Sequence, residues 1–315
     1  MHNHSHSHFG DTSKQTLSRL ALSLGLTLAF VFFEAAAGFI SNSLALLTDA
    51  AHNLTDVIAL GLSFYAVRLA TRPSNAQKTY GYHRAGILVA LVNATTLVII
   101  ALLIFYEAWQ RLLAPPEVQA GILVGVGLVA FAINLGTALL VKRGSEHDLN
   151  LRSAFVHLMG DVLSTVGAVI AGVIIYFTGA NWLDSVVSVL IGCLILWNAW
   201  GILRETVDIL LEATPRDVNM GAMIADLTQI NGVLGVHDLH VWSISSNLRT
   251  MSAHILTDDI SISNGAIIQA QVNELLAHHY NIAHATLQLE CSGCAPDVLY
   301  CDIAEAGHVH EEIRE

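Results

Sequence analysis

The sequence predicts an α-helical membrane protein with six transmembrane helices, followed by a small cytosolic α+β domain. Hydrophobic residues make up 54% of the 315 residues and charged residues only 13%, against about 25% charged in soluble domains. Six apolar stretches are long enough to cross ~30 Å of hydrocarbon at ~1.5 Å per residue. Beyond residue 206 the pattern changes to short alternating runs and amphipathic stretches.

The predicted spans cover most of the first two thirds of the chain. They are residues 17–39, 45–68, 85–106, 119–141, 154–178 and 184–203. Short polar turns around Asn42 and Gly179 join the first span to the second and the fifth to the sixth. We therefore expect a transmembrane domain over residues 17–205. The preceding residues 1–16 form a His-rich cytosolic arm, in which histidines alternate with Asn and Ser, as in a weak metal-collecting segment.

The distribution of Lys and Arg predicts the orientation in the membrane, because cytoplasmic loops carry the excess of these residues. One side of the predicted bundle has a single basic residue, Arg111. The other side has ten, namely Lys14, Arg19, Arg68, Arg72, Lys78, Arg84, Lys142, Arg143, Arg152 and Arg204. Both termini are therefore expected in the cytoplasm, and Cys291, Cys294 and Cys301 are not expected to form structural disulfides there.

The cytosolic domain is expected over residues 206–291, with a flexible Cys- and His-containing tail at 292–315. The predicted elements are a helix at 219–230, strands at 233–245 and 249–257 joined at Ser246-Asn247, a helix at 264–280, and a strand at 285–290. This αββαβ order suits a ferredoxin-like fold with its helices on one face of a sheet. A domain of this size buries only a modest core, so dimerisation would stabilise it.

Two predicted spans carry the same motif, His-x-x-x-Asp, as His52 with Asp56 and as His157 with Asp161. Placing one Asp at the centre of a membrane costs about 2.5–3.5 kcal/mol. Residues i and i+4 share one helical face, so two such faces brought together offer two imidazoles and two carboxylates, a tetrahedral zinc-type set. The alternative is a pair of His–Asp hydrogen bonds that hold helices together, but Ser, Thr or Asn would do this at lower cost.

Glu34 and Asp49 are further carboxyl groups within the predicted spans. Asp49 precedes His52 by three residues, and it either orients an imidazole or is a polar residue near a helix end. The sequence around Glu34 does not indicate a role for it.

A second zinc site is predicted in the cytosolic domain. His237 and His254 lie on strands that form a hairpin, and Glu290 ends the last strand. Histidine and carboxylate ligands are typical of zinc sites, and a regulatory role fits; the alternative is surface histidines. Weaker candidate ligands are His284, Cys291, Cys294 and Cys301.

The sequence argues against several functional classes. Only 14 Lys and Arg residues are present, with no basic patch for a nucleic acid. The chain has no P-loop for ATP and no His-Glu-x-x-His metalloprotease motif. A four-ligand cage holds ions too tightly for fast channel conduction. The acidic net charge of −12 says little about substrates, because the acids concentrate in the C-terminal third.

Five stretches of the chain carry a family resemblance. They are SLALLTDAAHNLTD at 43–56, YGYHR at 80–84, NLRSA at 150–154, VHDLHVW at 236–242 and HATLQLE at 284–290. Together they resemble the cation diffusion facilitators, and among these the bacterial zinc-efflux branch. The resemblance implies a homodimer in the bacterial inner membrane, with a cytosolic metallochaperone-like domain, alternating access and proton exchange. It places the transported ion on His52, Asp56, His157 and Asp161, and a cytosolic ion on His237, His254 and Glu290.

Ligand chemistry gives an expected mechanism for transport. Zinc requires deprotonated ligands, so zinc and protons compete for the same imidazoles and carboxylates, and an inward proton gradient drives zinc out without ATP. Nitrogen and oxygen ligands disfavour Cu(I) and admit zinc, cadmium or cobalt(II). A membrane-anchored zinc sensor or buffer would use the same ligands, whereas a metal-dependent enzyme would need an open metal position and a general base.

Overall fold

The computed structural model describes residue 25, residues 27–142 and residues 149–291. The chain divides into two compact units. The first unit comprises the membrane helices up to Tyr65 and from Val89 to Leu203. The second comprises the segment Ala66–Leu88 and the chain from Arg204 onward. Each unit has its own hydrophobic core.

Five described helices are long and apolar enough to cross a membrane. They are α2 (Leu44–Ala70), α3 (Ala85–Leu113), α4 (Ala120–Lys142), α5 (Leu149–Thr178) and α6 (Trp182–Leu210). The described part of the first predicted span is the helix Thr27–Ser41. The helical membrane domain is thus confirmed, and most helices run a few residues past the predicted spans, because helix formation does not stop where the apolar residues do.

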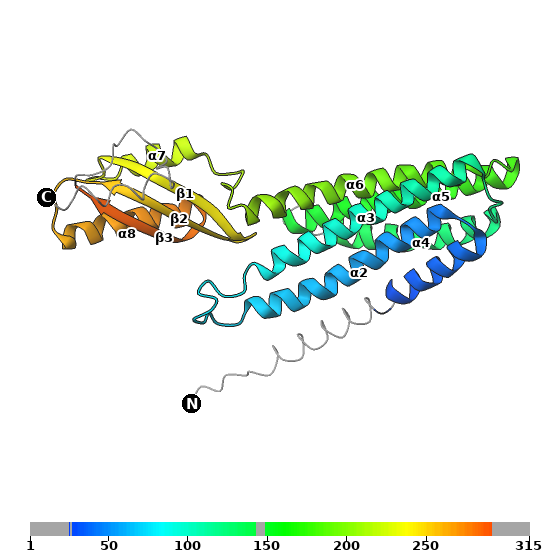
Figure 1. The fold of residues 1–315 in the computed structure, drawn as a ribbon, viewed down its shortest axis with the longest axis horizontal. Coiled ribbons are helices and arrows are strands. Elements are labelled where there is room, and N and C mark those ends of the chain that lie inside the picture. Colours follow the sequence, from blue (N-terminus) through cyan, green and yellow to red (C-terminus); the bar gives the residue numbers. More distant parts are fainter. Residues whose placement is uncertain (1–24, 26, 143–148, 292–315) are drawn as a thin grey trace, which may run out of the picture. The chain divides into compact units, whose positions relative to one another are not determined.

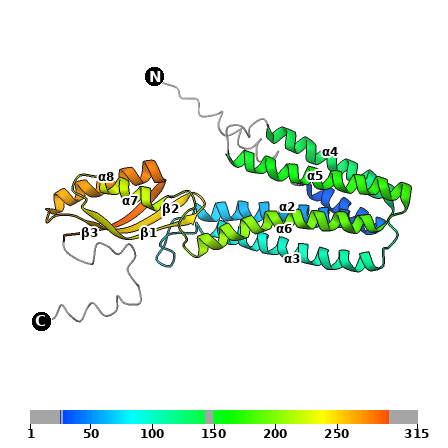
Figure 2. The same ribbon diagram turned by 90° about the horizontal axis from the view of Figure 1, so that it is seen from above.

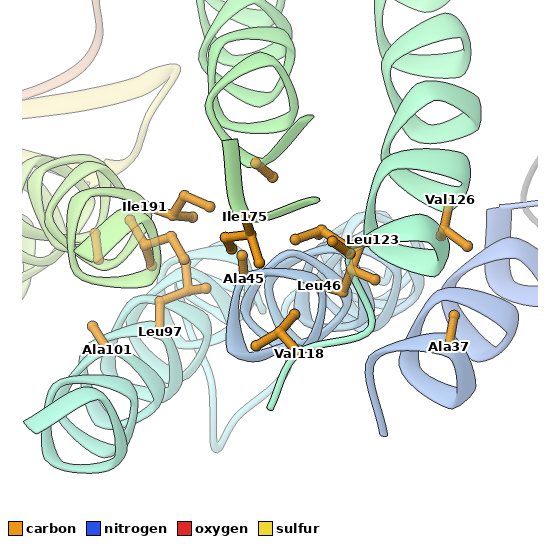
Figure 3. Packing of buried hydrophobic residues seen from close by; sticks show 14 residues of the cluster. Ala37, Ala45, Leu46, Leu97, Ala101, Val118, Leu123, Val126, Ile175 and Ile191 are labelled. Atoms are coloured by element: carbon orange, nitrogen blue, oxygen red, sulfur yellow. The ribbon is translucent and has the colours of Figure 1, made fainter. Parts of the chain in front are cut away.

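Small residues bring the membrane helices close together. The buried cluster in Figure 3 combines alanines such as Ala45 and Ala101 with larger residues such as Leu123 and Ile175. Between α4 and α5, a Cβ atom added at Gly127 would come within 2.8 Å of Val169, and one added at Gly172 within 2.8 Å of Val124. Close backbone approach at small residues is typical of helices that associate in membranes.

The helices that carry the two His-x-x-x-Asp motifs run in opposite directions. In the ribbon views α2 and α5 belong to the same bundle of helices, and their chain directions are opposed (Figures 1 and 2). Short turns at Asn42 and Gly179, both in the left-handed backbone region, reverse the chain at one end of this bundle. The antiparallel arrangement decides which ligands face one another.

The second unit contains a three-stranded sheet and two helices. The elements are α7 (Met220–Thr228), β1 (Gly235–Ser245), β2 (Leu248–Leu256), α8 (Ile262–Tyr280) and β3 (Ile282–Glu290). The sheet order is β1-β2-β3, with β1 antiparallel and β3 parallel to β2. Both helices lie on one side of the sheet (Figure 2), where Leu227 and Val272 pack into the core. The predicted αββαβ domain is confirmed.

A bulge interrupts β1 next to a predicted ligand. The pairing of β1 with β2 shifts register between His237 and His240, and Asp238 between them has a φ of 48°. A β-bulge bends its strand and redirects side chains.

Candidate metal centres

The two His-x-x-x-Asp motifs converge into one cluster inside the membrane unit. His52 Nε2 lies 3.3 Å from Asp161 Oδ1, and His157 Nε2 lies 3.1 Å from Asp56 Oδ2. Within each helix the distances are longer, 3.5 Å from His52 to Asp56 and 3.9 Å from His157 to Asp161. Each imidazole therefore faces the carboxylate of the opposite helix most closely, as antiparallel motifs of equal spacing require.

The four ligands form two layers that differ in exposure. His52 and Asp161 are buried, with 6% and 11% of their side chains exposed. His157 and Asp56 are more open, at 39% and 32%. Ligand atoms of His52, His157 and Asp161 all lie within 4.8 Å of one another, and Asp56 contacts both imidazoles from the open layer. Two nitrogens and two carboxylates at such spacing suit one zinc ion.

Asp49 contacts other groups than the imidazole of His52. Its carboxylate accepts a hydrogen bond from Ser164 Oγ at 3.1 Å and lies 3.4 Å from Asn53 Nδ2. The Nδ1 atom of His52 is buried and has no hydrogen-bond partner among the described residues. Asp49 belongs instead to a neighbouring polar group that includes Glu34.

A second cluster forms in the cytosolic sheet from His237, His254 and Glu290. Glu290 Oε2 lies 3.1 Å from His237 Nε2, and Glu290 Oε1 lies 3.0 Å from His254 Nδ1. Neither contact is aligned as a hydrogen bond: Glu290 Oε2, His254 Nδ1 and both ring nitrogens of His237 are buried without such a partner among the described residues. Buried polar atoms that approach without hydrogen-bond alignment fit ligands of a shared metal ion.

Strand pairing explains why these three residues meet. His237 on β1 is the direct register partner of His254 on β2, so the two side chains share one face. Gln288 on β3 pairs with His254, and Glu290 follows two residues later on the same face. The cross-strand approach of the two histidines was expected from the hairpin.

Asp238 extends this cluster, although the sequence did not predict it as a ligand. Its Oδ2 lies 3.6 Å from His254 Nε2 and its Oδ1 lies 3.0 Å from His240 Nε2. In a regular strand Asp238 and His237 would point to opposite faces. The bulge at Asp238 removes this constraint, and no local sequence signal marked it.

The described members of the weaker predicted ligands do not join either candidate ligand group. His284 is near the start of β3, where its ring makes an edge contact with Tyr80 at 6.2 Å between centroids. Cys291 is an exposed free thiol outside the described ligand groups. Cys294, Cys301 and the N-terminal histidines lie outside the described residues.

Two family models together match almost the whole chain. The cation efflux transmembrane domain matches residues 20–211, and the cytoplasmic domain of cation efflux proteins matches residues 215–292. The chain belongs to the cation efflux family. The resemblance expected from the motifs is thereby confirmed.

Curated relatives of this cation efflux protein share about a third of its residues. The metal cation efflux system protein CzcD of Cupriavidus metallidurans is 34% identical over 92% of this chain and 90% of its own length. The zinc transporter ZitB of Escherichia coli is 35% identical over 98% of each. The cadmium, cobalt and zinc/H(+)-K(+) antiporter of Bacillus subtilis is 34% identical over 90% and 91%.

These matches give the broad activity of the cation efflux protein. It is a membrane protein of a family of metal-cation efflux transporters, and transport rather than catalysis is its class of function.

Proposed function

We propose that this protein exports zinc from the cytoplasm in exchange for protons, through a transport site formed by His52, Asp56, His157 and Asp161. The observation that carries the proposal is the convergence of two antiparallel His-x-x-x-Asp motifs inside the membrane unit. Intramembrane ionisable residues mark ion and proton pathways. The names of the relatives, a zinc transporter and a metal/H(+)-K(+) antiporter, support the same reading.

Competition at shared ligand atoms couples the two ions. Zinc binds deprotonated imidazole and carboxylate groups, so its binding expels protons. When the site faces the outside, protons re-enter the imidazoles and carboxylates and displace zinc. Rocking of helices about a fixed central site supplies alternating access. The open layer of His157 and Asp56 lies toward the predicted cytoplasmic ends of α5 and α2, which fits a site that receives zinc from the cytoplasm.

The proposal includes a membrane topology and an assembly. The protein lies in the bacterial inner membrane with both termini in the cytoplasm. Its regions are a His-rich arm at 1–16, the membrane domain at 17–205, the metallochaperone-like domain at 206–291 and a tail at 292–315. Two copies form a homodimer through the cytosolic domain, a reading that the matched cytoplasmic family domain supports.

The cytosolic cluster of His237, His254 and Glu290 binds a regulatory zinc ion in this proposal. Its donor set and its buried, unaligned ligand atoms fit zinc. Binding at the ends of three strands would fix their relative positions, which gives zinc a means to change the shape or pairing of the cytosolic domain.

The experiment is a flux assay in liposomes. The purified protein is reconstituted with a zinc-sensitive dye inside and a pH gradient across the membrane, without nucleotide. Wild type is compared with His52→Ala and Asp161→Ala, each of which removes one ligand of the buried layer. Glu107→Gln is the matched control, because Glu107 is a membrane-helix carboxylate paired with Arg111 outside the site.

Each outcome has a distinct meaning. We expect gradient-dependent zinc flux in wild type and Glu107→Gln, and its loss in both site variants. Stoichiometric zinc binding without flux in wild type would leave a membrane-anchored sensor or buffer. Flux that persists in both site variants would move the transport site elsewhere.

A further inference from the structure

A pair of carboxyl groups lies beside the proposed transport site and is not part of it. Glu34, from the helix Thr27–Ser41, is fully buried, and Asp49 on α2 is 4% exposed. The two carboxyl groups lie within hydrogen-bonding reach of each other. The amide nitrogen of Asn53 lies 3.4 Å from Glu34 Oε2 and 3.4 Å from Asp49 Oδ2, so it bridges the pair.

The pair has too few hydrogen-bond donors for two ionised carboxylates. Among the described residues neither carboxyl forms an ion pair with Lys or Arg, and Ser164 Oγ, 3.1 Å from Asp49 Oδ1, is the other neutral donor. The Oε1 atom of Glu34 is buried and has no donor among the described residues. A proton on one of the two carboxyl groups supplies the missing donor.

The titratable groups near the pair belong to the proposed transport site. The titratable neighbours of Asp49 there are Asp161 on α5, a second carboxyl group, and His52 on α2. Two carboxyl groups in contact inside a poorly polarisable interior do not both ionise. We therefore expect the pair to share one proton when no zinc is bound.

We propose that Glu34 and Asp49 form a proton-binding pair, separate from the zinc ligands, that holds one proton between its carboxyl groups and releases it when zinc binds. This inference rests on the proposed zinc site. Zinc bound at His52 places two positive charges nearly one helical turn from Asp49. That field favours ionisation of the second carboxyl. The proton leaves a carboxyl oxygen for water and returns when zinc dissociates, so the pair adds to the protons exchanged for each zinc ion.

The position of the pair gives it a role in the direction of exchange. Asp49 lies on the N-terminal side of His52, toward the turn that joins Thr27–Ser41 to α2. By the predicted orientation this turn faces away from the cytoplasm. Protons that enter from outside would then meet the pair before the zinc ligands. Ser164 connects the two, because its Oγ contacts both the Asp49 carboxylate and the backbone carbonyl of Asp161.

Infrared difference spectroscopy of the full-length protein in lipid bilayers tests the proposal, because a protonated carboxylic acid has its own carbonyl stretch, which shifts in D2O. Spectra are recorded with and without zinc for wild type, Glu34→Gln, Asp49→Asn and the double variant. Glu107→Gln is the control. Protons released per zinc are counted by calorimetry in buffers of different ionisation enthalpy.

We expect a carboxylic-acid band in wild type and the control that falls when zinc is added and is absent from the double variant. Protons released per zinc should fall by about one in the double variant, while one zinc still binds the transport site. If the double variant does not fold, the carboxylic-acid bands of wild type and of the two single variants test the proposal instead. No zinc-sensitive band in wild type, or an unchanged band and proton count after substitution, would overturn the proposal.

The outcomes separate this inference from the proposed function. Normal zinc flux with an unchanged proton count in the double variant refutes the pair alone. Zinc flux that persists in His52→Ala and Asp161→Ala refutes the proposed transport site itself.

Discussion

The hydroxyl group of Ser43 donates a 2.6 Å hydrogen bond to the carboxylate of Asp184, although 141 residues separate them in the chain. The same carboxylate accepts the backbone amide of Leu44 at 2.6 Å and that of Ala45 at 3.3 Å. These are the first amides of α2 and have no partner within the helix. Asp184, from the first turn of α6, thus caps the N-terminus of the helix that presents His52 and Asp56.

Replacing Asp184 should destabilise the membrane unit. Asp184→Ala leaves two buried amides and a hydroxyl without acceptors, at a cost of about 1–3 kcal/mol for such groups. Asp184→Asn keeps one acceptor oxygen and should cost less. Thermal unfolding of the purified protein checks the order wild type, Asn variant, Ala variant. Equal stability of all three would contradict the capping role.

Exchanging the ligands within one helix tests the cross-helix pairing. His52→Asp combined with Asp56→His retains two imidazoles and two carboxylates but places Asp opposite Asp161. We expect zinc binding to weaken by at least about tenfold, a scale seen when groups that orient metal ligands are lost. Exchanging both helices restores each imidazole to a carboxylate partner and should recover most of the affinity, because contacting residues couple. Zinc titration of the four proteins measures this; additive losses would argue against the pairing.

Removing Glu290 should abolish zinc binding at the cytosolic cluster. Glu290→Ala takes away the carboxylate that faces both His237 and His254. Bound zinc per chain should fall by about one, with the transport site still occupied. His284→Ala is the control, because His284 lies apart beside Tyr80. Metal analysis after equilibrium dialysis gives the stoichiometry, and the same loss in the control would show that it is unspecific.

An ion pair in the cytosolic unit should give a pH-dependent stability. Arg249 on β2 donates hydrogen bonds to both oxygens of Asp217, at 2.9 and 2.8 Å, and lowers the pKa of that carboxyl. A carboxyl group whose pKa is lowered by folding stabilises the folded state at pH values above its unfolded pKa, which is about 3.9 for Asp. This stabilisation is lost as the pH falls through the folded pKa. The pair is exposed on the Asp side, so it is worth at most about 1 kcal/mol.

Asp217→Asn should therefore speed hydrogen exchange in residues 215–228 at neutral pH. The difference in exchange rate between this variant and wild type should shrink below pH ~4, once exchange is corrected for intrinsic rates. Asp258→Asn, at an exposed position, is the control. A difference that grows in acid would show that the ion pair is not its source.

Much of the fold follows from the pattern of apolar residues. The hairpin turn at Ser246-Asn247 lies where turn residues interrupt two alternating runs, and α8 begins after Ser261, whose side chain accepts from Asn264 as an N-cap. The bulge at Asp238 was not predictable, since it depends on pairing with β2 rather than on local sequence. The link from Asp184 to Ser43 was equally hidden, because it joins residues far apart in the chain.

The clustering of the candidate ligands was predictable, but their nearest partners were not. Spacing alone placed His52 with Asp56 and His157 with Asp161 on single helical faces. It did not reveal that each imidazole lies nearest the other helix's carboxylate, which requires the antiparallel packing of α2 and α5. Glu34 drew no assignment because its partner Asp49 is on another helix.

Opposed motif directions give the cage an approximate twofold axis, which relates the His52–Asp161 layer to the Asp56–His157 layer. An ion arriving from either face of the membrane meets the same pair of donors, one imidazole nitrogen and one carboxylate oxygen. The ligands alone therefore do not distinguish entry from exit. In the proposed transport cycle, the direction has to come from features that break this equivalence, and the unequal exposure of the two layers is one such feature.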